Sequence, residues 1–365
     1  MFIAHIYTIP EVLSTAKVIV LGVSAFVITA AITPIFTYFL YRNKIKIKIK
    51  DKTVDGDKLT YVNKLHAHKS GTPTMGGVLV WGTVAILMVL MLFLAPFLAN
   101  LTGDDWFNRL NFLSRNQTWL LLFALIATAL LGLADDYMSI RGIGSNKGGG
   151  MRFAIRFGWL ILIAAVGAWW FFVKLESNFI HIPAVGDFKI GFWYIPLFIG
   201  VIVSMAVSSN ETDGLDGLNA GILIQAFAIF SLIAFYQGRF DIAAFCAVVC
   251  GSLLAFLWFN FYPARFFMGD TGAISLGATL GVVAMLTNTV LVLPFVVFIY
   301  FLESGSVIIQ LFSKKVFKKK VFLAAPIHHH FEAKGWPETK VTVRFWIING
   351  LMACLGLLIG ILGSG

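Results

Sequence analysis

The feature that most constrains this chain is a series of apolar runs, each close to 20 residues long, between residues 16 and 362. A run of about 20 apolar residues is what an α-helix needs to cross the hydrocarbon of a bilayer. Only 13% of the residues are charged and 59% are hydrophobic, whereas a soluble domain carries about 25% charged residues. Because lipid cannot satisfy an open backbone, the runs predict helices. The sequence therefore predicts an all-α, polytopic integral membrane protein.

We expect about ten transmembrane helices in a single transmembrane domain that covers residues 1–365. The least marked division lies near Thr287-Asn288-Thr289, because almost nothing polar interrupts the sequence there. The predicted spans are residues 16–41, 75–99, 117–134, 153–173, 192–208, 218–237, 240–259, 272–288, 289–312 and 341–362.

Lysine and arginine are concentrated in alternate loops, above all in segments 42–74 and 313–344. Cytoplasmic loops carry the excess of these residues, so both termini are expected outside, which requires an even number of spans. The basic residues flank membrane helices, where they suit anionic lipid. They lack interleaved stacking aromatics, so nucleic acid is not an expected partner. The loops expected on the cytoplasmic side, where they would form the active site, are about 42–74, 135–152, 209–217, 260–271 and 313–340.

Acidic residues gather at the cytoplasmic ends of three predicted spans. Asp135 and Asp136 close one apolar run, Asp213 and Asp216 lie in a glycine-rich turn, and Asp270 follows a third loop. Ionised side chains at the mouth of a membrane helix are costly to place, so their default interpretation is functional. Three carboxylate sites on one membrane face predict a divalent metal and a phosphorylated substrate.

The adjacent acids Asp135 and Asp136 cannot point the same way, because neighbours on a helix diverge by about 100°. One carboxylate can face a metal while the other faces a second group. The structural alternative is a helix end held by a salt bridge to Arg141 or Lys147.

Three further stretches carry candidate ligand-binding groups. Lys69 begins a loop that either simply enters a helix or aims a cation at an anion near that helix N-terminus. The aromatic residues of 258–272 form either an interfacial belt or a stacking surface for a base. His328-His329-His330 resemble zinc ligands, but three neighbours seldom ligate one ion without a scaffold, so we favour hydrogen bonding to phosphate.

In this order, the motifs resemble the phospho-N-acetylmuramoyl-pentapeptide-transferase family, the bacterial translocases that make lipid I, within the polyprenyl-phosphate N-acetylhexosamine-1-phosphate transferase superfamily. The likeness covers nearly the whole chain, including the ten-helix plan. The matching stretches are Gly71-Thr72-Pro73-Thr74-Met75-Gly76-Gly77, Asp135-Asp136-Tyr137, Thr212-Asp213-Gly214-Leu215-Asp216-Gly217-Leu218, Trp258-Phe259-Asn260, Met268-Gly269-Asp270, Pro326-Ile327-His328-His329-His330 and Val341-Thr342-Val343-Arg344-Phe345-Trp346-Ile347-Ile348.

The sequence departs from the family pattern at two places. Val207-Ser208-Ser209-Asn210-Glu211 stands where the family usually has Asn-Ala-Val-Asn-Leu, so an Asn is missing and Glu211 is extra. Ser139 replaces the usual Lys after the Asp-Asp-Tyr element, so that cation is either absent or supplied by Arg141 or Arg156.

The resemblance implies transfer of phospho-MurNAc-pentapeptide from UDP-MurNAc-pentapeptide to undecaprenyl phosphate, which gives lipid I and UMP in the first membrane step of peptidoglycan synthesis. It also implies Mg²⁺, contact with membrane lipid, a homodimer, inhibition by nucleoside antibiotics, and a multi-pass location in the bacterial inner membrane. The active site would be cytoplasmic and both termini periplasmic. A related transferase that uses another UDP-sugar is the alternative.

Two rivals come from other classes. A transporter would carry its acids in mid-span within broken helices, whereas these acids lie at helix ends. A CDP-alcohol phosphotransferase shares the opening acids of Asp213-Gly214-Leu215-Asp216-Gly217, but the Ala-Arg that follows in that family is missing.

Our hypothesis makes Asp270 the principal Mg²⁺ ligand, helped by Asp136. Asp135 would activate or orient the lipid phosphate, and covalent attack by Asp135 on the β-phosphate is the competing mechanism. The predicted catalytic residues are Asp135, Asp136, Asp270 and His328. By resemblance, the predicted substrate-binding residues are Lys69, Thr74, Arg156, Asn210, Asp213, Gly214, Leu215, Asp216, Asn260, Phe267 (stacked on uracil), Gln310, His328 and His329.

Overall fold

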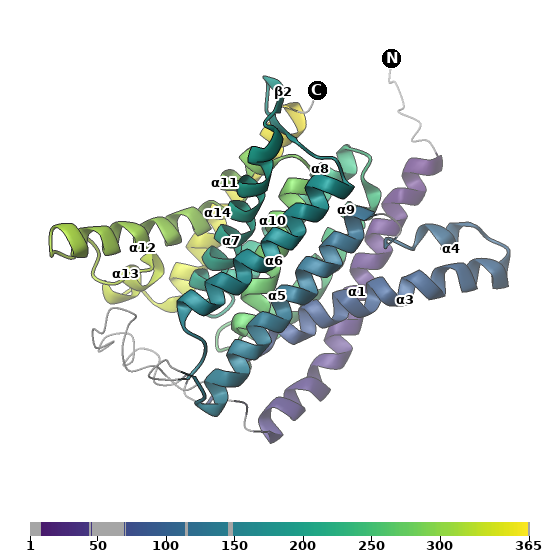
Figure 1. Ribbon diagram of the computed structural model, residues 1–365. Helices are drawn as coiled ribbons and strands as arrows, with labels where there is room; N and C mark the ends of the chain where they lie inside the picture. The colour runs from purple at the N-terminus through teal and green to yellow at the C-terminus, as the bar shows by residue number, and fades with distance from the viewer. Residues whose placement is uncertain are drawn as a thin grey trace, which may run out of the picture.

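The computed structural model describes residues 9–43, 45, 69, 71–113, 116–144 and 149–363, and helices dominate it (Figure 1). The basic stretch before Lys69, apart from Arg42 and Asn43, lies almost wholly outside the described residues. The long helices are α1 (Ile9–Arg42), α3 (Gly77–Thr102), α5 (Asn116–Arg141), α6 (Phe153–Lys174), α7 (Tyr194–Thr212), α8 (Leu218–Tyr236), α9 (Phe240–Asn260), α10 (Gly269–Leu286), α12 (Phe298–Val316) and α14 (Glu338–Leu362). The short elements are α4 (Trp106–Arg109), β1 (Phe179–Ile182), β2 (Gly186–Lys189), η2 (Gly191–Trp193), η3 (Val290–Val292), α11 (Leu293–Val296) and α13 (Ile327–Ala333).

Among these residues, nine helices are long and apolar enough to cross a membrane, and a bent pair brings the number to ten. The all-α polytopic fold is therefore confirmed. The ninth predicted span, 289–312, is not one straight helix. It bends by 84° at Val297, where the η3–α11 segment meets α12. As a result α12 projects sideways from the bundle, with α13 beside it (Figure 1).

Helix α10 forms the centre of the bundle, where it packs chiefly against α5 and α7. Every residue from Thr271 to Leu286 is buried. Small residues permit this packing, since in lipid they let helix backbones approach closely. At Gly277, for example, an added Cβ would lie only 2.5 Å from the carbonyl oxygen of Met205 on α7.

A two-stranded antiparallel hairpin lies at one end of the bundle and was not predicted. Strands β1 and β2 pair in the register Phe179–Lys189 to Ile182–Gly186. The His181 backbone N–H donates to Asn288 Oδ1 at 3.1 Å, and its ring contacts Asp187 and the carbonyl of Gly363. The hairpin, the first turns of α1 and the end of α14 all lie at this end (Figure 1), as an even number of spans requires.

Candidate active site

The carboxylate of Asp135 lies at the other end of the bundle, near the last turn of α5. One oxygen accepts the Met151 backbone N–H at 2.6 Å, and the other accepts the guanidinium of Arg156 at 2.9 Å. The structural alternative, a salt bridge between this helix end and Arg141, is wrong, because the Arg141 guanidinium lies over the ring of Tyr137. Lys147 lies outside the described residues.

The carboxylate of Asp136 points away from that of its neighbour, as helical geometry requires. Its two oxygens accept the backbone N–H groups of Asp270 and Thr271, both at 3.1 Å. These are orphan donors in the first turn of α10, so Asp136 caps that helix from a neighbouring one. The close approach depends on Gly132, where an added Cβ would lie 2.6 Å from the Cα of Thr271.

Asp270 is the most solvent-accessible of these three acids, with 29% of its side chain exposed against 7% for Asp135. Its Oδ1 accepts the side-chain amide of Asn210 at 2.7 Å, and its Oδ2 accepts Arg156 at 2.7 Å. One guanidinium therefore bridges Asp135 and Asp270, and it comes from the helix that follows the Asp135 loop.

Asp213 joins the same cluster from the turn after α7. Its carboxylate lies close to the backbone N–H of Gly269, immediately before Asp270. Burial, and then the nearby charge of Asp270, raises the pKa of Asp213 to about 7. Gly269 has a φ of +75°, and a Cβ there would lie 2.6 Å from Asp136 Oδ2 and 2.8 Å from Thr74 Oγ1. The acids of three separate loops thus lie together, with Thr74 beside them.

Lys69 forms a second charged group. Its ammonium contacts Asp216 and Glu338, each at 2.6 Å, and lies 5.6 Å from the centre of the Phe267 ring. Burial alone would lower the pKa of Lys69, but Glu338 and Asp216 outweigh it and raise the pKa. The second carboxylate of this group, Glu338, was missed by the sequence reasoning.

Backbone hydrogen bonds connect the loop after Lys69 to the loop before Asp270. The N–H of Phe267 donates to the Pro73 carbonyl, and the N–H groups of Gly76 and Gly77 donate to the carbonyls of Phe267 and Met268, all at 2.8 Å. The side chain of Asn260 joins two neighbouring loops. Its oxygen accepts a hydrogen bond from the Gly217 N–H at 3.1 Å, and its amide donates to the Phe266 carbonyl at 2.8 Å. Leu215 is buried.

The histidine segment forms a third group, in which each of the first two imidazoles has an acidic partner. His328 Nδ1 lies 3.0 Å from Glu303 in α12, and His329 Nδ1 lies 2.8 Å from Glu332. Burial would lower the pKa of His328, but Glu303 raises it overall. Among the residues that the structure describes, the His328 Nε2 atom has no hydrogen-bond partner; it is buried and faces Gly214, where a Cβ would collide with it.

Gln310 and Glu211 have structural partners. Gln310 Oε1 accepts the N–H groups of Val321 and Phe322, both at 3.0 Å, so it holds the turn after α12. Glu211 accepts the hydroxyl of Ser304 at 2.6 Å and so joins α7 to α12. The residue that departs from the family pattern therefore faces α12 rather than Asp270.

The described residues contain no group of three His, Cys, Asp or Glu side chains arranged to hold a metal ion by themselves. That arrangement still fits Mg²⁺, which usually binds through one or two carboxylates together with waters and substrate phosphates. Four acids, Asp135, Asp136, Asp213 and Asp270, lie together in this cluster, and Arg156 contacts two of them, Asp135 and Asp270. The donor set is therefore rich in carboxylates, and the one on Asp270 is partly accessible.

Comparison with known proteins gives consistent matches. Residues 118–288 match Glycosyl transferase family 4, and residues 69–79 match phospho-N-acetylmuramoyl-pentapeptide-transferase signature 1. A phospho-N-acetylmuramoyl-pentapeptide-transferase of Geobacillus sp. (strain WCH70) is 36% identical over 92% of this chain and 95% of its own length. That of Pelagibacter ubique is 37% identical, over 92% and 90%. The chain belongs to the phospho-N-acetylmuramoyl-pentapeptide-transferase family. The signature region of this family contains Lys69 and Thr74, and the glycosyl transferase match contains Asp135, Asp136, Asp213 and Asp270.

Two acidic residues of the site, Glu303 and Glu338, lie outside every motif used for prediction. Glu303 is fully buried in α12, after an apolar first turn of that helix. An isolated acid in a membrane helix is itself a functional signal, and it was available in the sequence. Glu338 follows a proline at the start of α14, where an acid normally indicates only a favourable helix start.

Proposed function

We propose that this transferase moves phospho-MurNAc-pentapeptide from UDP-MurNAc-pentapeptide to undecaprenyl phosphate, giving lipid I and UMP in peptidoglycan synthesis. An oxygen of the lipid phosphate attacks the sugar-linked phosphorus of the donor. The bond from that phosphorus to the bridging oxygen breaks, and the electron pair leaves with UMP. The convergence of Asp135, Asp213 and Asp270 from three loops is the observation that carries the proposal.

Asp135 orients the lipid phosphate through the guanidinium of Arg156 rather than attacking the donor. Its two oxygens are already occupied by the Met151 N–H and Arg156, which supports direct transfer over a covalent aspartyl-phosphate. A phosphate monoester has a second pKa near 6, so the attacking oxygen is largely ionised at neutral pH. Arg156 and Lys69 supply the cations that bring two anionic substrates together.

Asp270 is the proposed Mg²⁺ ligand, with Asp136 in support. Bound Mg²⁺ would neutralise charge on the phosphates during transfer. Asp136 keeps the first turn of α10, and hence Asp270, in position. Phe267, beside Lys69, would stack on uracil, and Gly214, Leu215, Asp216, Asn260, Gln310, His328 and His329 would line the nucleotide-sugar site.

The proposed setting is the cytoplasmic face of a bacterial inner membrane, with the carboxylate cluster inside and the hairpin end outside. The excess of Lys and Arg on the loops at the cluster end supports this orientation. A homodimer and inhibition by nucleoside antibiotics follow as expectations for the family.

The direct experiment measures UMP release from UDP-MurNAc-pentapeptide by the reconstituted protein, with and without undecaprenyl phosphate and Mg²⁺. Release should require both, and Asp270→Asn should lower it by about a thousandfold, the scale of one lost charge-stabilising group. Glu176→Gln, an exposed carboxylate at the other end of the bundle, is the matched control. Normal turnover of Asp270→Asn would refute the assignment, and a UDP-GlcNAc donor tests the alternative substrate.

A further inference from the structure

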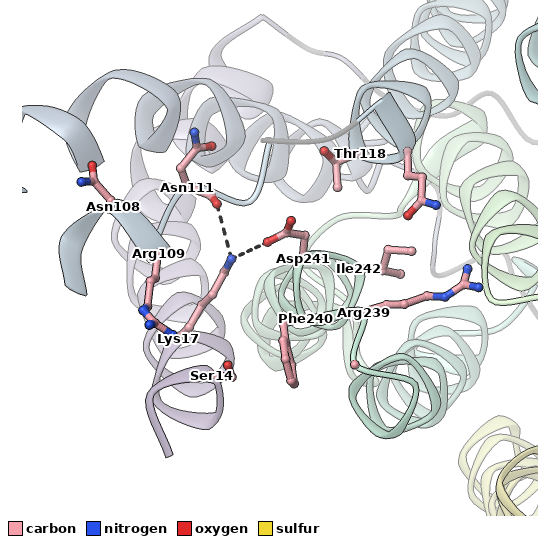
Figure 2. Close-up of a pocket in the computed structure, with 12 residues that line it drawn as sticks. Ser14, Lys17, Asn108, Arg109, Asn111, Thr118, Arg239, Phe240, Asp241 and Ile242 are labelled. Atoms are coloured by element: carbon pink, nitrogen blue, oxygen red, sulfur yellow. Dashed lines mark hydrogen bonds and ion pairs between the residues drawn. The ribbon is translucent and has the colours of Figure 1, made fainter. Parts of the chain in front are cut away.

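Two largely buried acid–base pairs differ in how fully their polar atoms are satisfied. In the first, beside a cavity of about 280 Å³ among α1, α4, α5 and α9, the ammonium of Lys17 contacts Asp241 at 2.5 Å and donates to the Asn111 carbonyl at 3.4 Å (Figure 2). The second pair is Glu303 and His328. Their Oε1 and Nε2 atoms are buried and have no hydrogen-bond partner among the described residues. Buried polar atoms of this kind call for an explanation, because they are costly to leave unpaired.

One carboxylate oxygen of Glu303 contacts His328 twice. Glu303 Oε2 lies 3.0 Å from the ring Nδ1 and 3.4 Å from the backbone nitrogen of His328 near the start of α13. The side chain of Glu303 is 0% exposed and that of His328 is 1% exposed, so water does not reach this contact. Because a carboxylate accepts hydrogen bonds, Nδ1 carries the hydrogen. The pair therefore fixes both the tautomer and the orientation of the ring.

The other ring nitrogen of His328 faces a glycine in the turn between α7 and α8. A Cβ at Gly214 would collide with Nε2 and would lie 2.9 Å from Cε1, so only glycine lets the ring lie there. The turn also contains Asp213, which belongs to the carboxylate cluster, and Asp216, which is paired with Lys69. The imidazole therefore lies against the turn that joins the two charged groups of the site.

The charges around His328 favour the imidazolium form. Burial would lower the pKa of His328, but Glu303 and then Glu332 outweigh it and raise the pKa, while Lys69 opposes them. The other titratable groups next to this ring are His329, whose ring centre lies 4.1 Å away, and the turn acids Asp213 and Asp216. An imidazolium donates from both nitrogens. Nε2 is then a charged donor of the kind that binds phosphate oxygens strongly.

We propose that Glu303 is a positioning residue of the transfer site, which holds Nδ1 of His328 so that Nε2–H donates to a phosphate oxygen of the nucleotide donor at the Gly214 turn. This inference rests on the proposed function in one respect, namely that the nucleotide sugar binds at this turn. The turn covers Nε2, so the contact requires α13 to shift relative to Gly214. Since α12 and α13 contact each other, the Glu303–His328 pair stays together during that shift. A carboxylate that holds an imidazole in this way orients the ring and stabilises its charged form.

The first test follows the ring nitrogens of His328 by NMR in the whole protein with isotope-labelled histidine, and assigns them by their loss in His328→Gln. The wild-type ring should titrate above pH 6.5, the ordinary pKa of histidine, and Glu303→Gln should titrate at a lower pH than the wild type. Glu211→Gln is the matched control, because this acid also contacts α12, through Ser304 at 2.6 Å, and it should leave the titration in place. A wild-type His328 that titrates at or below pH 6.5 overturns the proposal without any variant.

The same spectra test the contact with phosphate. UDP, which carries the two phosphates of the donor, should shift the Nε2 signal of His328 in the wild type. An Nε2 signal that saturating UDP leaves unmoved overturns the proposal. A protein that shows this shift but releases no UMP would contradict the proposed transfer reaction alone.

The pH dependence of UMP release separates positioning from a merely structural role. The imidazolium is present below its pKa and is lost as pH rises through it, so Glu303→Gln should lose more activity at pH 8 than at pH 6. The loss at pH 8 should be about tenfold or more, the usual effect of one charge-assisted hydrogen bond. Glu303→Asp, which keeps the charge, should recover part of it. An equal loss at both pH values, without recovery in Glu303→Asp, would overturn the proposal.

Discussion

At the scale of single residues, the site is organised by cations that each serve two acids. Arg156 bridges Asp135 and Asp270, and Lys69 bridges Asp216 and Glu338. A buried ion pair contributes little net stability, but removing one member leaves an uncompensated buried charge. The two cations should therefore matter for folding as well as for substrate binding.

Lys69→Gln should destabilise the protein by about 3–5 kcal/mol, because Asp216 and Glu338 would remain buried without their cation. Adding Glu338→Gln to Lys69→Gln should recover part of that loss. The melting temperature in detergent measures both effects. Lys315→Gln, an exposed lysine at the end of α12, should change it little, and a Lys69→Gln protein as stable as this control would contradict the ion-pair network.

Asp213 should make stability fall as pH rises. Its pKa is raised from 3.8 to about 7 in the folded state, so between these values the folded chain holds a proton that the unfolded chain has lost. The stability from this group is present below pH 3.8 and is lost as pH rises towards 7. The loss should be about 2 kcal/mol, after allowance for solvent near the turn.

The measurement compares the metal-free melting temperatures of the wild type and Asp213→Asn at pH 5 and pH 8. The amide cannot ionise, so the variant should gain stability relative to the wild type at pH 8 and gain less at pH 5. An identical pH dependence in the two proteins would exclude Asp213 as the titrating group.

At the scale of elements, the contact between α5 and α10 positions three acids at once. Asp135 and Asp136 end one helix, Asp270 begins the other, and Gly132 lets the two backbones meet. An inserted methyl group must therefore separate the helices or shift the acids.

Gly132→Ala should cost about 1–3 kcal/mol of stability by overpacking and should lower UMP release, because Asp136 would lose its contact with the first turn of α10. Gly158→Ala in α6 is the matched control, since a Cβ there meets nothing within 4 Å. Melting temperature and turnover should fall together in Gly132→Ala alone. A fully active and stable Gly132→Ala protein would show that this contact does not position the acids.

How well each element could be predicted depends on the physical origin of its sequence signal. Apolar run length predicts spans well because bilayer thickness fixes it, so nine of the ten spans coincide with single helices. Apolar run length cannot reveal the bend at Val297, because apolar residues continue through it. Asp135, Asp213 and Asp270 were predictable as a cluster because each ends or begins a span on the same side. The partners of Glu303 and Glu338 were not predictable, because these contacts form only in the tertiary structure and each acid stands alone in the sequence.

At the scale of the whole molecule, the two ends of the bundle differ in chemistry. One end holds the carboxylate cluster and the basic stretch after α12. The other end holds the hairpin and both ends of the described chain (Figure 1). The proposed orientation places the first end in the cytoplasm.

Cysteine labelling in intact cells can test this orientation. In a background without the native cysteines, Lys189→Cys on the hairpin should react with a membrane-impermeant maleimide. Lys318→Cys, in the exposed segment after α12, should react only after the cells are permeabilised. The reverse pattern would place the carboxylate cluster outside the cell.

The burial of α10 on all sides has a mechanical consequence. Because neighbouring helices enclose α10 from Thr271 to Leu286, this helix cannot tilt or rotate without repacking the protein. We therefore expect the Asp270 carboxylate in its first turn to keep its position during turnover. Any adjustment to an arriving or departing molecule must then be made at the periphery. Helix α12, which projects sideways from the bundle, and the short α13 beside it lie at that periphery (Figure 1), so we expect the adjustment there.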